Sequence, residues 1–140
     1  GSLGFDLQTL GDQLLAGLDT PLRLSTLPHR SLSIPAEAFC LDFACLPQPC
    51  TGVAEVRITA TDSGVLSALA MWFELRFDGE DAPPLSCASG SALRAWKQVV
   101  HFLPRPPRRV AKGEALALEV AYTEAGFASR VAEAAAAGRR

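Results

Sequence analysis

The sequence predicts a mostly β protein, an antiparallel β-barrel or jelly-roll-like sandwich with one short N-terminal amphipathic helix. Short segments alternate apolar and polar residues with a period of two, which is typical of strands with one buried face. Glycine and proline separate these segments at intervals of about ten residues, as in all-β folds. Apolar residues make up 49% of the 140 residues and charged residues 20%, which predicts a folded core.

A chain of this length fits one domain, and we expect a single domain over residues 1–140. Its predicted parts are a helix and loop over residues 1–30, a barrel over residues 31–131 and a frayed tail over residues 132–140. In the first part, Leu10, Leu14 and Leu18 recur at helical spacing and predict a short amphipathic helix that ends before Pro21. An apolar stripe does not say which surface it covers, so the helix packs either on the barrel or on a partner domain.

The first strands are predicted between residues 39 and 61. Phe39, Leu41 and Phe43 alternate with polar or small residues. Residues 55–61 alternate more clearly, with three apolar side chains on one face, and the turn residues Asp62-Ser63-Gly64 then predict a hairpin.

Further strands are predicted over residues 69–77, 96–103 and 116–122. In the first of these, Met71, Phe73, Leu75 and Phe77 should face the interior. Glycine or proline follows the first two strands, and Lys112-Gly113 precedes the third. Residues 125–131 fit a last strand, whereas the alanine-rich residues 132–137 have high helix propensity, so the end of the chain is open to both interpretations.

Composition excludes several function classes. A net charge of −2 argues against nucleic acid as a partner, because binding to phosphate backbones needs an excess of basic residues. The sequence has no run of about 18 apolar residues and no secretory signal, so we expect no membrane partner. Cys40, Cys45 and Cys50 are spaced wrongly for zinc, and with Cys87 they are expected to be free thiols of a reducing compartment, the cytoplasm and/or the nucleus. The Gly1-Ser2 start suggests a piece of a longer protein.

Catalytic motifs are not found. The sequence contains neither a dinucleotide-binding nor a phosphate-cradling glycine motif, and no metal site is expected. Its two histidines, His29 and His101, are far apart and lack a neighbouring nucleophile. We therefore expect this chain alone to be inactive, with no catalytic residues and no cofactor of its own.

Four stretches carry a more specific signal, and they follow one another in the order Leu69-Ala-Met-Trp-Phe-Glu-Leu-Arg-Phe77, Leu85-Ser-Cys-Ala-Ser-Gly90, Ala95-Trp-Lys-Gln-Val-Val-His-Phe-Leu-Pro104 and Val110-Ala-Lys-Gly-Glu-Ala-Leu116. Together they resemble the C-terminal β-barrel module of protein arginine N-methyltransferases. Gly4-Phe5-Asp6 is similar to the start of that family's dimerisation arm. Residues 29–35 and 39–43 make the chain most similar to the second module of the tandem, monomethylating type III enzyme, the seventh mammalian member.

This resemblance implies a division of labour between domains. In the family, a domain that binds S-adenosyl-L-methionine carries the catalytic residues, and the barrel faces arginine-containing protein substrates through a Thr-His-Trp loop. The tryptophan of that loop matches Trp96 here, whereas Arg94 and Ala95 replace the threonine and histidine. The resemblance thus implies a degenerate substrate-binding loop at Arg94 and Trp96. It also implies a module that mimics half of a dimer, with Leu10, Leu14 and Leu18 as its interface.

Two alternatives remain open at this stage. Trp96 fits a purely structural role as well, because tryptophan on a strand commonly packs against neighbouring side chains. The whole chain also fits a free-standing β-sandwich binding module for a carbohydrate or protein ligand, for which Trp72 and Tyr122 are the candidate exposed aromatic residues.

Overall fold

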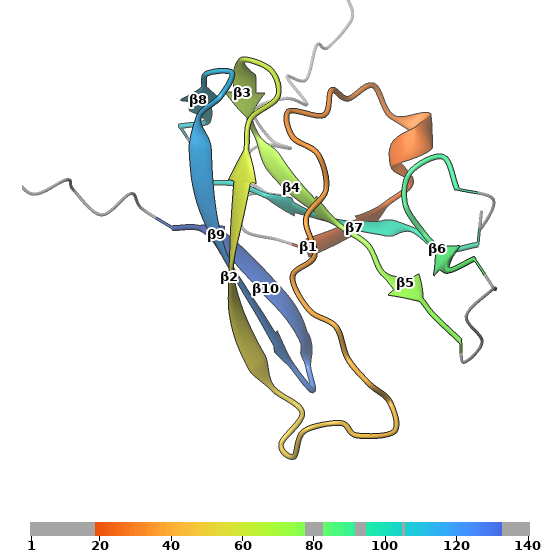
Figure 1. Cartoon of the computed structure of the whole chain (residues 1–140). Coiled ribbons are helices and arrows are strands. Elements are labelled where there is room, and N and C mark those ends of the chain that lie inside the picture. Colours follow the sequence, from red (N-terminus) through yellow and green to blue (C-terminus); the bar gives the residue numbers. More distant parts are fainter. Residues whose placement is uncertain (1–18, 78–82, 92–94, 105, 133–140) are drawn as a thin grey trace, which may run out of the picture. The chain divides into compact units, whose positions relative to one another are not determined.

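A computed structural model of the chain describes residues 19–77, 83–91, 95–104 and 106–132 (Figure 1). Within these residues every strand pairing is antiparallel, and the one helix is a three-residue 3-10 turn, so the predicted mostly β, antiparallel class is confirmed. The elements are β1 Asp19–Leu22, η1 Leu24–Thr26, β2 Gly52–Thr59, β3 Gly64–Leu66, β4 Ala68–Met71, β5 Glu74–Leu75, β6 Leu85–Ser86, β7 Gln98–Phe102, β8 Arg108–Val110, β9 Ala115–Thr123 and β10 Gly126–Val131.

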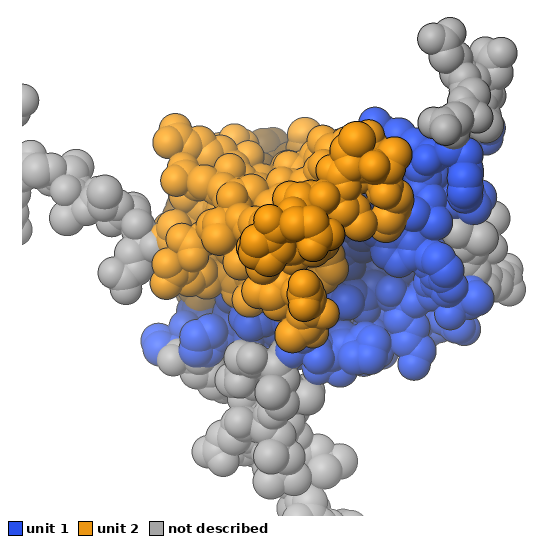
Figure 2. Space-filling view, turned by 90° about the horizontal axis from the view of Figure 1, so that it is seen from below, with its two compact units in different colours: residues 1–30, 67–107 blue, residues 31–66, 108–140 orange. Residues whose placement is uncertain are grey.

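The chain divides into two compact units (Figure 2). Unit 1 comprises residues 1–30 and 67–107, and unit 2 comprises residues 31–66 and 108–140. Unit 1 contains the sheet β1-β7-β4 and the pair β5-β6, whereas unit 2 contains the sheet β10-β9-β2 and the pair β3-β8. The predicted division into arm, barrel and tail remains a prediction.

The main sheet of unit 2 follows the period of two that the sequence shows. Val56 on β2 lies opposite Leu118 on β9, and both strands turn their even-numbered side chains to the same face. On that face Val56, Leu116, Val120 and Tyr122 are buried, whereas the odd-numbered residues of β2 are exposed. The hydrophobic core of unit 2 therefore lies on one face of this sheet.

The predicted hairpin at residues 62–64 is wrong. β2 pairs with the distant β9, and β3 pairs with β8, so the strands on either side of the turn do not pair with each other. The ladder instead passes around a bend, where the Ala60 amide donates to the Glu114 carbonyl at 2.9 Å and the Gly113 amide donates to the Ala60 carbonyl at 2.7 Å. The long apolar face of β9 offers β2 a much larger partner than the three residues of β3.

The predicted strand over residues 39–43 is also wrong, because this stretch is a loop. Asp42 makes local bonds: its carboxylate accepts from the Ala44 amide at 2.9 Å and its carbonyl from the Cys45 amide at 3.1 Å. Such local bonds compete with a strand ladder. Phe39 nevertheless packs edge-on against Tyr122, with 4.7 Å between the ring centroids.

In unit 1, the central strand β7 pairs with β1 on one side and with β4 on the other. The buried apolar residues in the described part of unit 1 are Leu69, Cys87 and Val100. The predicted continuous strand over residues 69–77 is broken between β4 and β5. Phe73 and Phe77, which were expected inside, are 42% and 61% exposed, because the break removes the ladder that would have fixed the alternation.

The described strands form four separate sheets of two or three strands, so the hydrogen bonding within the described residues does not close into a single barrel. The predicted helix with Leu10, Leu14 and Leu18 lies outside the described residues, as does the tail beyond residue 132. Residues 126–131 form β10, in agreement with the strand interpretation of that stretch. A helix long and apolar enough to cross a membrane is not found among the described residues.

Candidate functional site: an exposed aromatic pair

Trp96 lies two residues before the start of β7 in unit 1, and it is 46% exposed. It contacts Phe73, which lies in the break between β4 and β5 and is 42% exposed. The ring centroids are 4.5 Å apart and the ring planes are tilted by 53°. Aromatic faces carry partial negative charge, so an exposed pair of this kind can hold an apolar group or a planar cation.

Gln98 fixes the start of β7 two residues after Trp96. Its side chain is buried, with an exposed fraction of 3%. Nε2 donates to the Cys87 carbonyl at 2.6 Å, and Oε1 accepts from the Leu24 amide at 2.9 Å. Removing this side chain would be costly, because the Cys87 carbonyl and the Leu24 amide would each lose a hydrogen bond. Gln98 therefore joins β7 to the segment after β1 and to the segment after β6.

Cys87 carries this support on to Phe73. The Cys87 thiol is fully buried, donates to the Phe73 carbonyl at 3.3 Å and accepts from the Phe73 amide at 3.4 Å. The Cys87 amide also donates to the Phe73 carbonyl at 3.2 Å. Cys87 thus hydrogen-bonds both the N–H and the C=O group of Phe73. Together with the hydrogen bonds of Gln98, these bonds fix the backbone on both sides of the aromatic pair.

Apolar side chains near the pair in sequence are exposed as well. Leu85 on β6 lies opposite Leu75 on β5 and is 42% exposed, and Phe77 follows at the end of the described segment. Unit 1 therefore presents several large apolar side chains to its surroundings, which is typical of a surface that binds a partner or ligand.

The structure places only one of the predicted site residues. Trp96 is present and exposed, whereas Arg94, Leu10, Leu14 and Leu18 lie outside the described residues and their roles stay predictions. Sequence reasoning missed Phe73, Cys87 and Gln98 as individual site residues. The signal that could have found Cys87 and Gln98 was their presence in the two stretches quoted above for the family resemblance.

Among the described residues, the side chains with a clearly shifted pKa are Glu114 and Arg130, both in unit 2. Glu114 has a pKa below its usual value, mainly because it accepts a hydrogen bond from the Ala111 amide and also because it binds Arg108. The pKa of Arg130 is raised by its hydrogen bond and ion pair with Glu119. Both groups stabilise strands or turns of unit 2 and neither lies in the unit that carries Trp96.

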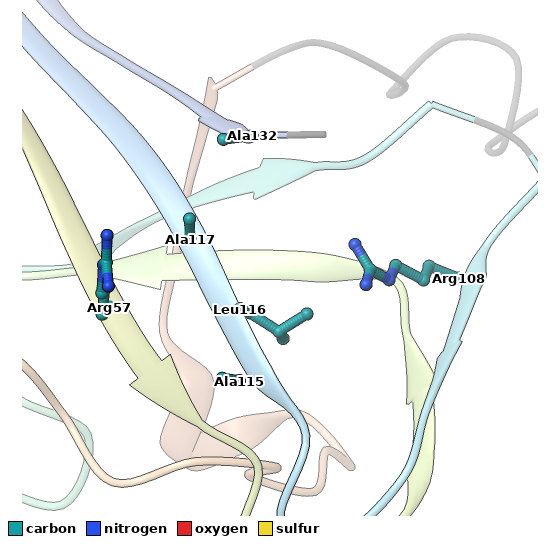
Figure 3. A pocket seen from close by; sticks show the side chains of 6 residues that line it. All are labelled: Arg57, Arg108, Ala115, Leu116, Ala117 and Ala132. Atoms are coloured by element: carbon teal, nitrogen blue, oxygen red, sulfur yellow. The ribbon is translucent and has the colours of Figure 1, made fainter. Parts of the chain in front are cut away.

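Unit 2 contains a second feature that the sequence did not indicate, a cavity of about 190 Å³ beside β9 (Figure 3). Arg57 from β2 and Arg108 from β8 line it together with alanines of β9. Each arginine already has an acidic partner: Arg57 binds Glu55 at 3.2 Å and Arg108 binds Glu114 at 2.7 Å. The cavity therefore offers an anion no unused positive charge.

Among the described residues, no group of three or more histidine, cysteine or acidic side chains lies close enough together to hold a metal ion. Cys40 and Cys45 are exposed, Cys50 is half-buried, and the four cysteines are free.

Fold and site together define an antiparallel β module with an exposed, internally supported aromatic pair. Residues 2–132 match the model of the arginine methyltransferase oligomerization subdomain. This chain belongs to that family, as the sequence resemblance predicted. The finer likeness to the second module of the type III enzyme stays a prediction.

Relatives of known activity support the same assignment. An arginine N(omega)-methyltransferase from Streptomyces achromogenes subsp. streptozoticus is 35% identical over 122 residues, which are 86% of this chain and 32% of the relative. Protein arginine N-methyltransferase 9 is 30% identical over 121 residues in Homo sapiens and 33% identical over 121 residues in Mus musculus, in each case over 86% of this chain and 14% of the relative. The chain thus spans a third or less of these relatives.

Proposed function

We propose that this chain is the substrate-facing module of an S-adenosyl-L-methionine-dependent protein arginine methyltransferase. The observation that carries the proposal is the exposed Trp96 and Phe73 pair, held in place by Gln98 and Cys87. A guanidinium group is planar and cationic, so it stacks well on an aromatic face. In this proposal the pair holds an arginine side chain, or the peptide beside it, while another domain supplies the chemistry.

The catalytic and cofactor-binding functions belong, in this proposal, to a separate domain of the same or another chain. Two cavities lined by described residues of unit 2 measure about 190 and 250 Å³. Typical small-molecule sites measure roughly 300–1,000 Å³, and an acidic side chain commonly binds the ribose of a nucleotide. Neither cavity is that large or lined by an acid, so these residues do not fit S-adenosyl-L-methionine.

Further parts of the proposal rest on the family. Leu10, Leu14 and Leu18 would dock on the cofactor-binding domain, so that the module replaces one half of a dimer. We also propose the cytoplasm and/or the nucleus as its location, because its four cysteines are free and a reducing compartment keeps thiols in that state.

The free-standing carbohydrate-binding alternative loses one of its two candidate aromatic residues. Tyr122 is 7% exposed and packs against Phe39 and Phe127, so it is a core residue and not part of an open platform. The described residues of unit 1 instead offer Phe73 with Trp96 as a pair of exposed aromatic side chains in contact.

The proposal is tested with a short peptide that contains one central arginine, titrated into the whole chain by calorimetry, which does not depend on the tryptophans that the variants remove. We expect saturable binding in the millimolar range that is lost in Trp96→Ala and kept in Trp72→Phe, which removes the other indole of the chain. A peptide with lysine at the same position should bind at least about threefold more weakly, because ammonium stacks less well on aromatic rings than guanidinium. Equal binding by both peptides, or unchanged binding by Trp96→Ala, would contradict the proposal.

The division of labour has its own measurement. Calorimetric titration of S-adenosyl-L-methionine into the chain should give no binding heat, and tight binding would show that the cofactor belongs to this module.

A further inference from the structure

The loop that precedes β2 contains a tight turn with an aromatic residue at its tip. The Cys45 amide donates to the Asp42 carbonyl at 3.1 Å, and the Ala44 amide donates to the Asp42 carboxylate at 2.9 Å. These two bonds fix the backbone on both sides of Phe43. Phe43 is nevertheless 75% exposed. A ring that is displayed on a fixed turn loses little conformational freedom on binding, so it is well suited to contact a partner.

This loop is attached to one end of the main sheet of unit 2. Phe39, four residues before Phe43, packs on Tyr122 of β9 with 4.7 Å between the ring centroids. Tyr122 lies opposite Gly52, where β2 begins, and opposite Phe127 of β10. Four residues span at most about 14 Å, so Phe43 stays near this end of the sheet. Figure 1 shows the loop before β2 and the turn between β9 and β10 at the same end.

Phe127 presents a second exposed ring at this end. It follows the turn between β9 and β10, is 50% exposed and lies 6.4 Å from the Tyr122 ring between centroids. We call residues 42–45 and 123–127 together the loop end of unit 2. Exposed aromatic rings of this kind, attached to a packed core through Tyr122, are typical of a surface that binds a partner.

The charge around the loop end is negative. Residues 31–56 and 113–129 contain no lysine, arginine or histidine, but contain the acids Glu37, Asp42, Glu55, Glu114, Glu119 and Glu124. Glu55, Glu114 and Glu119 are each paired with an arginine. Asp42 and Glu124, which lie in the two turns of the loop end, have no ion pair among the described residues. The complement of this surface is an apolar stripe flanked by positive charge.

We propose that the loop end of unit 2 docks a basic amphipathic helix of a partner protein. Phe43 and Phe127 contact the apolar stripe of that helix, and Asp42 and Glu124 pair with the lysine or arginine side chains beside the stripe. A helix of 18 residues is about 27 Å long, which is enough to contact both turns. The negative charge of the loop end disfavours an anionic lipid surface as the partner, because like charges repel.

The test uses a synthetic 18-residue amphipathic helix of leucine and lysine, titrated into the whole chain by calorimetry. We expect saturable binding that weakens at least about tenfold in Phe43→Ser, because an exposed aromatic anchor carries a large share of the binding energy. Ile34→Ser is the matched control. Ile34 is 71% exposed, but its neighbour Ser33 bridges to Ala60 beyond the other end of β2, so this variant should bind like the original chain. Circular dichroism establishes that each variant is folded.

The charges are tested separately from the rings. Asp42→Asn combined with Glu124→Gln removes both charges, and asparagine can still accept the bond from the Ala44 amide. Binding should weaken at least about threefold in this variant and lose most of its salt dependence. Asp62→Asn is the control, because Asp62 accepts a similar local bond from the Ser63 amide at 2.8 Å in the turn that follows the other end of β2. Its affinity for the helix should be unchanged.

A helix of leucine and glutamate, with the same apolar face and the opposite charge, should not bind. Equal binding of the two helices, no binding of the leucine and lysine helix, or unchanged binding by Phe43→Ser overturns the proposal. Trp96→Ala should bind the helix like the original chain. A loss in that variant but not in Phe43→Ser assigns the helix to unit 1 and also overturns the proposal. The arginine peptide proposed for Trp96 should in turn bind Phe43→Ser normally, so the two proposals fail independently.

Discussion

Gly52 shows how a single residue can be fixed by its neighbour across a strand pair. It starts β2 directly opposite Tyr122 of β9, and the tyrosine ring covers it. A Cβ atom on Gly52 would collide with the ring, reaching 2.9 Å from Cζ and 3.0 Å from the hydroxyl oxygen. The ring has little freedom to move, because Phe39 packs against it edge-on at 4.7 Å. The position therefore requires the absence of a side chain.

We predict that Gly52→Ala lowers the free energy of unfolding by about 1–3 kcal/mol, which is the usual cost of overpacking a core. Chemical denaturation followed by circular dichroism measures it. The loss should be partly recovered in the double variant with Tyr122→Leu, since leucine lacks the ring atoms that the new methyl group meets. Gly113→Ala serves as a comparison, because there a loss of stability would come from backbone strain and not from a steric clash. Nothing lies within 4 Å of the Cβ position of Gly113, and its φ of +85° alone costs about 1–2 kcal/mol in a residue with a side chain. Purely additive losses in the double variant would contradict the steric explanation.

The residues of the aromatic site show what a sequence can and cannot reveal at this scale. Trp96 could be singled out because the family resemblance marks it. Gln98 and Cys87 could not be assigned their roles, because their bonds join positions 24, 73, 87 and 98. Such long-range pairing has no local spacing rule. The prediction that Phe73 is buried was wrong for a related reason. The alternating pattern continues through residues 69–77, but the strand is interrupted between β4 and β5, and the pattern alone does not show this break.

Among the elements, the turn between β8 and β9 is held mainly by Glu114. Its carboxylate accepts from the Ala111 amide at 2.9 Å and from Arg108 at 2.7 Å. Gly113 supplies the positive φ within this turn. The same residues form the bend at which the ladder passes from β2 and β9 to β3 and β8.

The depressed pKa of Glu114 predicts a defined pH dependence. A carboxyl group whose pKa is lower in the folded state stabilises that state above its unfolded pKa, here about 4.5, and loses the contribution as pH falls through the folded pKa. Glu114→Gln should therefore unfold at a lower temperature than the original chain near neutral pH, and the difference should shrink progressively below pH 4.5. Thermal melts over a pH series measure this, with Glu124→Gln as the control for removal of one exposed carboxylate. A difference that is constant with pH would contradict the assigned cause.

At the level of elements, strands with a strong period of two were predictable and their partners were not. β2 and β9 could be recognised in the sequence because each is long and buries the side chains of one face, which produces a clear alternation of apolar and polar residues. The alternation at residues 39–43 looks the same in sequence, but Asp42 bonds locally and no strand lies alongside it in the described chain. The turn chemistry of residues 62–64 was recognised correctly as a change of direction, whereas β2 and β3 pair with β9 and β8, each more than forty residues away along the chain.

In the molecule as a whole, the two units are interleaved in sequence. The chain passes from unit 1 to unit 2 after residue 30, returns after residue 66 and crosses again after residue 107. Among the described residues, buried apolar side chains are concentrated in unit 2, which contains Val56, Ala60, Leu66, Val110, Leu116, Val120 and Tyr122, whereas the described part of unit 1 contains Leu69, Cys87 and Val100. Most of the apolar burial in the described part of the chain thus lies in unit 2.

We therefore predict that unit 2 folds without unit 1. Leu66 and Arg108 are direct partners on β3 and β8, so their Cα atoms are about 4.5–5.5 Å apart and a two-residue Asn-Gly turn can join them. A chain of residues 31–66, this turn and residues 108–140 should give a dispersed NMR spectrum with cross-strand contacts between β2 and β9. We expect lower stability than in the whole chain, because domains of about 70 residues have small cores. The converse chain of residues 67–107 should be unfolded, since it lacks β1 and has few buried residues. A collapsed, undispersed spectrum of the joined chain would show that the sheet of unit 2 depends on unit 1.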